Sequence, residues 1–199
     1  MQIAEYFDSV ASYWDDDYSE AKAARIVAAT VSIPRGGACV LDIGCGSGSM
    51  FLDLLEAGAC EIEGVDISKG MTDAAREKFC FDPRIHIVQE DFLAHEQPGF
   101  DVLMAFNSYH HFPQPRLFLK KARELLRPKG RLTVAFPFDR ERMNTLSSIM
   151  PAGLARGLLP AEEEGVFWRE WFDIDCLCDN DGLYLISGLA KQKKGNNEA

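Results

Sequence analysis

Three glycines separated by single residues follow directly after a short aliphatic run in VLDIGCGSGSM, residues 40–50. Glycine loses more conformational freedom on folding than any other residue, so such a cluster marks backbone that turns tightly or approaches a ligand closely. The aliphatic run predicts a buried strand, and the spacing of Phe51, Leu54 and Leu55 predicts a helix after it. A glycine turn between a strand and a helix offers backbone N–H groups and a helix N-terminus to a polar, partly anionic ligand.

Two ligand classes compete for this turn. The dinucleotide fingerprint GxGxxG, counted from Gly44 and Gly46, requires a third glycine where the chain has Ser49. Gly48 comes one residue too early for that spacing. Asp42 would direct a carboxylate toward the turn, where it would repel a pyrophosphate but accept hydrogen bonds from an ammonium group. A zwitterionic ligand therefore suits the turn better, and an NAD-type oxidoreductase is the alternative.

The run VLDIGCGSG resembles the first motif of the class I S-adenosylmethionine-dependent methyltransferases, which is an aliphatic strand followed by DxGxGxG. GVDIS, QEDF and RPKGRL match further motifs of the family in the same order. The matches cover about residues 38–136, roughly half to two thirds of the chain. The resemblance implies S-adenosylmethionine as cofactor and methyl transfer as activity, similar to the small-molecule enzymes that include the C-methyltransferases of quinone biosynthesis. A non-catalytic binding or interaction protein with the same fold is a second alternative.

The resemblance also implies roles for residues at the strand ends. Asp66 matches the carboxylate that binds the ribose hydroxyls, and Asp91 matches the acid that accepts a hydrogen bond from the adenine amino group. Asn107 is expected to flank the methionine portion. The cofactor-binding residues implied in this way are Trp14, Asp42, Gly44, Cys45, Gly46, Gly48, Asp66, Ile67, Met71, Asp91, Phe92 and Asn107.

Methyl transfer from a sulfonium is an in-line displacement by a reagent that is already activated, so the protein mainly has to desolvate and align the acceptor. We expect no metal and no nucleophilic side chain, and the sequence has no GxSxG, HExxH or GxxxxGK motif. In FNSYHHFPQP, His110 could take a proton from an oxygen or nitrogen acceptor, since the ordinary histidine pKa of about 6.5 suits neutral pH. The alternative is that His110 and His111 pack and anchor the loop.

Aromatic and acidic residues are gathered near the N-terminus in FDSVASYWDDDYSE, residues 7–20. In similar enzymes this segment folds over the cofactor as a lid, which would bring Trp14 onto the ligand. The aromatic rings beside the acids at 15–17 could also shelter a cationic acceptor. Alternatively, the rings dock a helix onto the core and the acids form a solvated face.

Strand-like and helix-like runs alternate along the chain and so predict a parallel sheet with helices on both faces. In the first helix, Ala24, Val27, Ala28 and Val31 have helical spacing. The expected helices cover residues 19–33, 51–58, 68–79 and 114–127, and the expected strands cover 39–43, 61–66, 84–88, 100–106 and 131–136.

Two later strand-like runs, WFDIDCLC and LYLISGLA, are joined by Asp179, Asn180, Asp181 and Gly182, a composition that predicts an antiparallel hairpin. The expected fold is therefore α/β, a Rossmann-like three-layer sandwich whose mostly parallel seven-stranded sheet ends in this hairpin.

The 199 residues suit one domain, which we place at 1–190. Within it, we expect a helical lid region at 1–33 and a cover of broken helix at 137–165. Residues 191–199 are expected to be a flexible tail. A second subunit, as in a homodimer, or the lid could roof the acceptor pocket.

Composition narrows the partners. A net charge of -10 disfavours nucleic acid, and no apolar run reaches the roughly 18 residues of a membrane span. The six cysteines show no disulfide framework, so we expect reduced thiols and a cytoplasmic protein. A small-molecule acceptor is the favoured partner.

Overall fold

The computed structural model describes residues 2–14 and 21–192. The acidic run at 15–17 and most of the expected tail lie outside these residues. The helices are α1 (Ile3–Val10), α2 (Lys22–Ser32), α3 (Phe51–Ala57), α4 (Lys69–Phe79), α5 (Pro115–Leu125), α6 (Arg140–Ile149) and α7 (Ala161–Trp168), with short 3-10 turns η1 (Ala11–Tyr13) and η3 (Tyr109–His111). The strands are β1 (Ala38–Ile43), β2 (Ala59–Asp66), β3 (Ile85–Gln89), β4 (Phe100–Phe106), β5 (Leu126–Phe136), β6 (Phe172–Asn180) and β7 (Leu183–Ala190).

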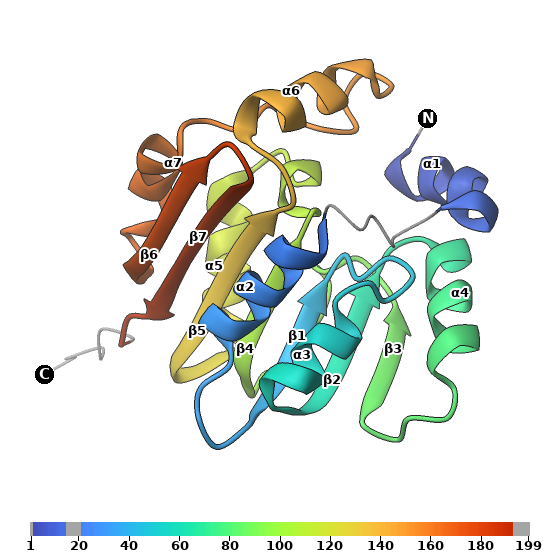
Figure 1. Cartoon of the computed structure of the whole chain (residues 1–199), viewed down its shortest axis with the longest axis horizontal. Coiled ribbons are helices and arrows are strands. Elements are labelled where there is room, and N and C mark those ends of the chain that lie inside the picture. The colour runs from blue at the N-terminus through green and yellow to red at the C-terminus, as the bar shows by residue number, and fades with distance from the viewer. Residues whose placement is uncertain (1, 15–20, 193–199) are drawn as a thin grey trace, which may run out of the picture.

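The described strands form a seven-stranded sheet in the order β3-β2-β1-β4-β5-β7-β6. The first five pair in parallel, whereas β7 runs antiparallel to both β5 and β6. Helices α2, α3 and α4 cover one face, and α5 and α7 cover the other (Figure 1). The structure therefore confirms the expected three-layer α/β fold with its C-terminal hairpin.

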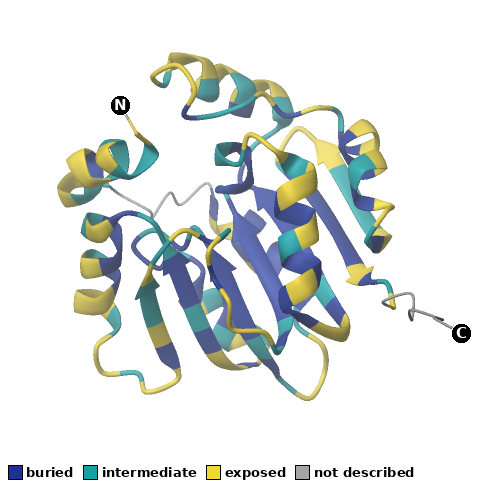
Figure 2. Ribbon diagram, turned by 180° about the vertical axis from the view of Figure 1, so that it is seen from behind, coloured by how far each residue is buried: buried dark blue, intermediate teal, exposed yellow. Residues whose placement is uncertain are grey.

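The central strands are buried on both faces, as Figure 2 shows. This burial matches the near-continuous apolar runs from which the strands were predicted. Residues of α2 depart from the prediction, because Val27 is 42% exposed while Ala24, Ala28 and Ala29 are buried. The small alanines allow α2 to lie close to the sheet, and the larger Val27 points outward.

The boundary between α5 and β5 also differs from the sequence prediction. The helix ends at Leu125 and the strand begins at Leu126, which pairs with Phe100 before a register shift leads into the regular ladder. Pro128 explains the early end, since proline disfavours helical backbone at the preceding residue. Leu126, which the prediction placed in the helix, is buried in the strand.

The carboxyl ends of the parallel strands lie together at one edge of the sheet, and α1 and α6 lie above that edge (Figure 1). In this architecture ligands bind beyond the carboxyl ends of the strands, so both helices are positioned to roof a site. Within the described part of the chain, no helix is long and apolar enough to cross a membrane.

Gly48 has a packing role at the start of α3. Its φ is +90°, and a Cβ there would lie 2.6 Å from the Phe79 ring and 2.8 Å from the Phe51 ring. Both rings belong to the packing between α3 and α4, where their centroids are 5.1 Å apart. The glycine therefore lets the turn lie directly on this aromatic pair.

We expect Gly48→Ala to lower the free energy of unfolding by about 2–4 kcal/mol, because backbone strain and overpacking add. Gly36→Ala is the matched control, since Gly36 has a φ of +107° but nothing within 4 Å of a Cβ. It should cost about 1 kcal/mol, the strain alone. Urea unfolding measures both, and equal losses would contradict the packing role.

Candidate functional site

A single carboxylate fixes the glycine turn. Asp66, the last residue of β2, accepts hydrogen bonds from Gly46 N at 2.9 Å and from Ser68 N at 2.8 Å. Gly44 N and Cys45 N both donate to Val65 O, at 2.8 and 3.1 Å. These three turn amides are therefore bonded within the protein, contrary to the expectation that the turn offers its N–H groups to a ligand.

What the turn provides instead is close access to its backbone. Gly46 has a φ of +55°, and a Cβ built on it would meet nothing within 4 Å. Gly44 is tightly enclosed, since a Cβ there would lie 2.6 Å from Ser108 Cβ. Ser108 Oγ donates to Ile43 O at 2.5 Å and so ties the loop after β4 to the end of β1.

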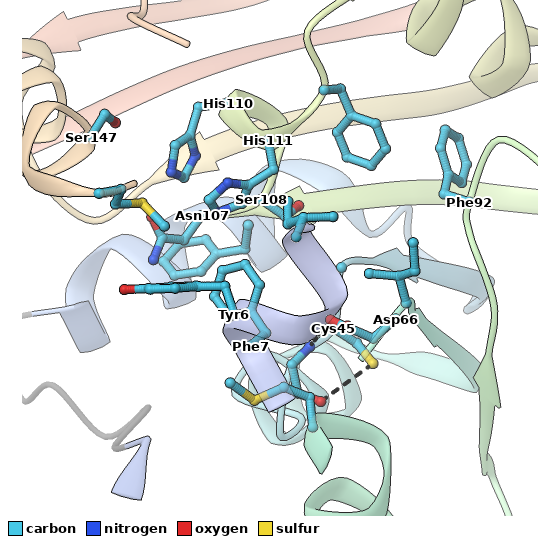
Figure 3. A pocket seen from close by; sticks show the side chains of 18 of the residues that line it. Tyr6, Phe7, Cys45, Asp66, Phe92, Asn107, Ser108, His110, His111 and Ser147 are labelled. Carbon is cyan, nitrogen blue, oxygen red and sulfur yellow. Dashed lines mark hydrogen bonds between the residues drawn. The ribbon is translucent and has the colours of Figure 1, made fainter. Parts of the chain in front are cut away.

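A cavity of about 630 Å³ opens beside the turn (Figure 3). This volume lies within the range of about 300–1,000 Å³ that is typical of small-molecule sites. The cavity brings together most of the residues predicted from sequence, namely Trp14, Gly44, Cys45, Gly46, Asp66, Ile67, Met71, Asp91, Phe92, Asn107 and His110.

Two of the predicted residues do not line this cavity. Asp42 is buried within β1, only 2% exposed, and Gly48 lies against Phe51 and Phe79. The prediction for Gly48 rested on the motif, and the prediction for Asp42 also assumed that its carboxylate points toward the turn. The motif does not say which of its residues face the ligand.

The two histidines of η3, His110 and His111, both line the cavity but differ in the hydrogen bonds of their rings. His110 is 4% exposed, and its Nδ1 has no hydrogen-bond partner among the described residues. Burial, together with the neighbouring His111 and Arg156, holds the pKa of His110 well below its usual range. Burial also lowers the pKa of His111, although a hydrogen bond to Leu154 O opposes the shift.

The bond to Leu154 defines the tautomer of His111. Its Nδ1 lies 2.7 Å from the Leu154 carbonyl oxygen, which can only accept, so Nδ1 carries the hydrogen. Nε2 of the neutral ring is then an acceptor. The ring packs edge-on against Phe7 of α1, with centroids 5.1 Å apart, so the N-terminal helix touches the histidine loop directly.

A buried ion pair holds the histidine loop from above. Arg156 donates two hydrogen bonds to Glu164, at 2.8 and 3.1 Å, and Glu164 is fully buried. Tyr109 Oη donates to the same carboxylate at 2.8 Å, and the guanidinium lies over the Tyr109 ring. Arg156 N also donates to His110 O at 2.9 Å. We call this the Arg156–Glu164 brace.

The N-terminal helix is attached to the body through Asp8. Its Oδ1 accepts from Ser68 Oγ at 2.7 Å and from Gly70 N at 2.8 Å, and these bonds lower the pKa of Asp8. A Cβ on Gly70 would lie 2.8 Å from Ala11 Cβ, so α1 and η1 sit directly on the start of α4. This anchor brings Ile3, Tyr6 and Phe7 onto the cavity wall.

Comparison with known proteins agrees with the fold. Residues 41–132 match the family model described as "Methyltransferase domain". Over 132 residues the chain is 30% identical to the 27-O-demethylrifamycin SV methyltransferase of Amycolatopsis mediterranei. The aligned region covers 61% of this chain and 48% of that protein. The chain is 32% identical over 108 residues to the ubiquinone biosynthesis O-methyltransferase of Xylella fastidiosa, with 52% and 43% covered.

Solved structures share the fold at low sequence identity. The N-methyltransferase NodS from Bradyrhizobium japonicum, in complex with S-adenosyl-L-homocysteine, superposes with a TM-score of 0.75 at 13% identity, covering 96% of this chain and 100% of that one. A putative methyltransferase in complex with the Trm112 activator of Haloferax volcanii superposes with a TM-score of 0.76 at 17% sequence identity. The match covers 92% of this chain and 97% of that one.

The sheet order, the glycine turn and the strand-end acids give the Rossmann-like fold that these methyltransferases share. Residues 41–132 are similar to the methyltransferase domain family, and the structural neighbour NodS, which holds S-adenosyl-L-homocysteine, supports S-adenosylmethionine as the cofactor. The chain spans about half the length of the curated relatives that it matches.

The cavity fits S-adenosylmethionine. Gly46 leaves open space for a close approach, and Asp66 and Asp91 present carboxylates at the ends of β2 and β3. Asn107 Oδ1 is buried on the wall without a hydrogen-bond partner among the described residues, as expected where a polar ligand supplies one.

We expect Asp8→Ala to weaken binding of S-adenosylhomocysteine about 2–10-fold, because losing two hydrogen bonds loosens α1 over the cavity. Ser9→Ala on the same helix is the control, since Ser9 Oγ bonds only to Tyr6 O among the hydrogen bonds of the described residues. Calorimetric titration provides the affinities. Unchanged binding by the Asp8 variant would show that α1 does not cover the ligand.

Because the pKa of His110 is low in the folded protein, we expect the protein to lose stability in mild acid. Unfolded histidine takes up a proton near pH 6.5, whereas folding holds His110 neutral to lower pH. The free energy of unfolding should therefore fall as pH falls from 7 to 5, and His110→Gln should reduce the slope. Chemical unfolding at several pH values tests this, and identical slopes would contradict it.

Proposed function

We propose that this chain transfers a methyl group from S-adenosylmethionine to a small-molecule acceptor. The observation that carries the proposal is the single cavity wall shared by the glycine turn, the acids Asp66 and Asp91, and the buried His110. The names of both curated relatives refer to small molecules, rifamycin and ubiquinone, which agrees with a small acceptor.

Cofactor binding is assigned to the β1–β4 side of the cavity. Asp66 retains acceptor capacity beyond its two backbone bonds, because a carboxylate offers about four lone-pair sites, and it suits a ribose diol. Asp91 accepts from Leu93 N with one oxygen and is otherwise exposed, so the other oxygen can meet an adenine amino group. Met71, Phe92 and Ile67 supply apolar wall.

The bound cofactor supplies an activated methyl group, and the chain's own residues exclude water and orient the acceptor. Phe7 and Trp14 contact each other, with ring centroids 5.6 Å apart, and close the cavity from the N-terminal side. Burial holds the pKa of His110 well below its usual range, so the ring is neutral and a ring nitrogen can accept a hydrogen bond from the acceptor. The Arg156–Glu164 brace fixes the backbone that carries His110.

Calorimetric titration with S-adenosylhomocysteine tests the assignment directly. Asp66→Ala should weaken binding by about 10–100-fold, because hydrogen bonds to a charged group are lost. Asp91→Asn leaves the turn bonds of Asp66 intact and should also weaken binding. Asp82→Ala is the control, since Asp82 pairs with Arg84 at the surface.

Binding of NADH in place of the sulfonium product, or equal affinity in all three variants, would refute the assignment. Binding without any methylated product across a broad panel of acceptors would instead indicate a protein that holds the cofactor and transfers nothing.

A further inference from the structure

The cavity extends beyond the proposed cofactor residues into a second half between α1 and α6. We call this half the acceptor chamber and define its wall by Phe7, Phe138, Met143, Leu146, Met150 and Ser147. All but Ser147 are apolar, and two of them carry aromatic rings. Such a wall favours a flat or apolar body, because it replaces water contacts with dispersion contacts.

Two polar atoms interrupt this apolar surface. Ser147 Oγ on α6 and His110 Nδ1 on η3 are both buried without a hydrogen-bond partner among the described residues. Figure 3 shows both side chains at the α6 end of the pocket. A buried polar atom left unpaired costs about 1–3 kcal/mol, so such atoms on a cavity wall indicate that a ligand completes them.

The chemistry of the two atoms selects the ligand group. A serine hydroxyl both donates and accepts, and a neutral imidazole nitrogen does one or the other, depending on the tautomer. A hydroxyl group on the ligand can satisfy both, since it also donates and accepts. An ether or a hydrocarbon cannot supply the donor that an unprotonated Nδ1 requires.

The charges on the wall argue against a cationic ligand. The carboxylates of the described wall are Asp66, Glu90 and Asp91, which lie at the ends of β2 and β3. The Arg142 guanidinium also lines the cavity and lies 3.5 Å from the centroid of the Phe138 ring in the acceptor chamber. An ammonium group would meet this cation, whereas a neutral hydroxyl would not.

We propose that the acceptor chamber binds a flat apolar molecule through a hydroxyl group held between Ser147 Oγ and His110 Nδ1. This inference rests on the proposed function and narrows its acceptor to a class, hydroxyl-bearing rings. Ser147 is then a specificity-determining residue, a role that no sequence motif indicated.

Probe binding to the protein saturated with S-adenosylhomocysteine tests the inference without turnover. The probes are 2-naphthol, 2-methylnaphthalene and 2-naphthalenemethylamine, which share a ring system and differ in the polar group. Ligand-observed NMR titration should give 2-naphthol about 3–10-fold tighter binding than 2-methylnaphthalene, the effect of one or two hydrogen bonds.

Ser147→Ala should remove most of that preference by weakening 2-naphthol binding about 3–10-fold, with 2-methylnaphthalene unchanged. Ser148→Ala is the matched control on the same helix, because Ser148 Oγ donates to Thr145 O and does not line the cavity. Circular dichroism and S-adenosylhomocysteine affinity show whether each variant is folded.

Equal or absent binding of 2-naphthol and 2-methylnaphthalene overturns the inference, as does tighter binding of the amine or a preference that survives Ser147→Ala. If S-adenosylhomocysteine still binds in those cases, the proposed function stands and only the acceptor class is wrong. If S-adenosylhomocysteine itself does not bind, the proposed function fails.

Discussion

The hydrogen bonds that Asp66 accepts from Gly46 and Ser68 are the constraint on which the site depends. They join the first glycine turn to the end of the neighbouring strand, so two βα units share one rigid corner. The same carboxylate stands at the proposed ribose position. A group that is held by backbone amides before the ligand arrives loses little freedom on binding, which is the advantage of preorganisation.

Two sets of side-chain hydrogen bonds fix the loop after β4. Ser108 ties the loop after β4 to β1, while the Arg156–Glu164 brace ties the same loop to the segment before α7. Removing one partner of a buried ion pair is strongly destabilising, because the other charge is left uncompensated. The Arg156–Glu164 brace, whose carboxylate also accepts from Tyr109, therefore connects the histidine loop to α7 through bonds that depend on one another.

The order of strands and helices was predictable because it follows from local periodicity and turn composition. The α5–β5 boundary and the inward face of α2 were not, since pairing with Phe100 and close packing of alanines are tertiary effects. The residues that line the cavity at the strand ends, such as Asp66, Asp91 and Asn107, followed from motif positions. The bonds of Asp8 to Gly70, of His111 to Leu154 and of Tyr109 to Glu164 span 43 to 62 residues of the chain, where no local pattern reports them.

The close contact between Gly70 and Ala11 has a consequence for engineering. A methyl group at residue 70 would have to push η1 and the helix before it away from α4, because only 2.8 Å separates its position from Ala11 Cβ. Gly70, which does not line the cavity, thus limits how closely α1 and η1 can approach α4. Directed evolution toward bulkier substrates can therefore begin with substitutions at Gly70, which leave the residues that line the cavity unchanged.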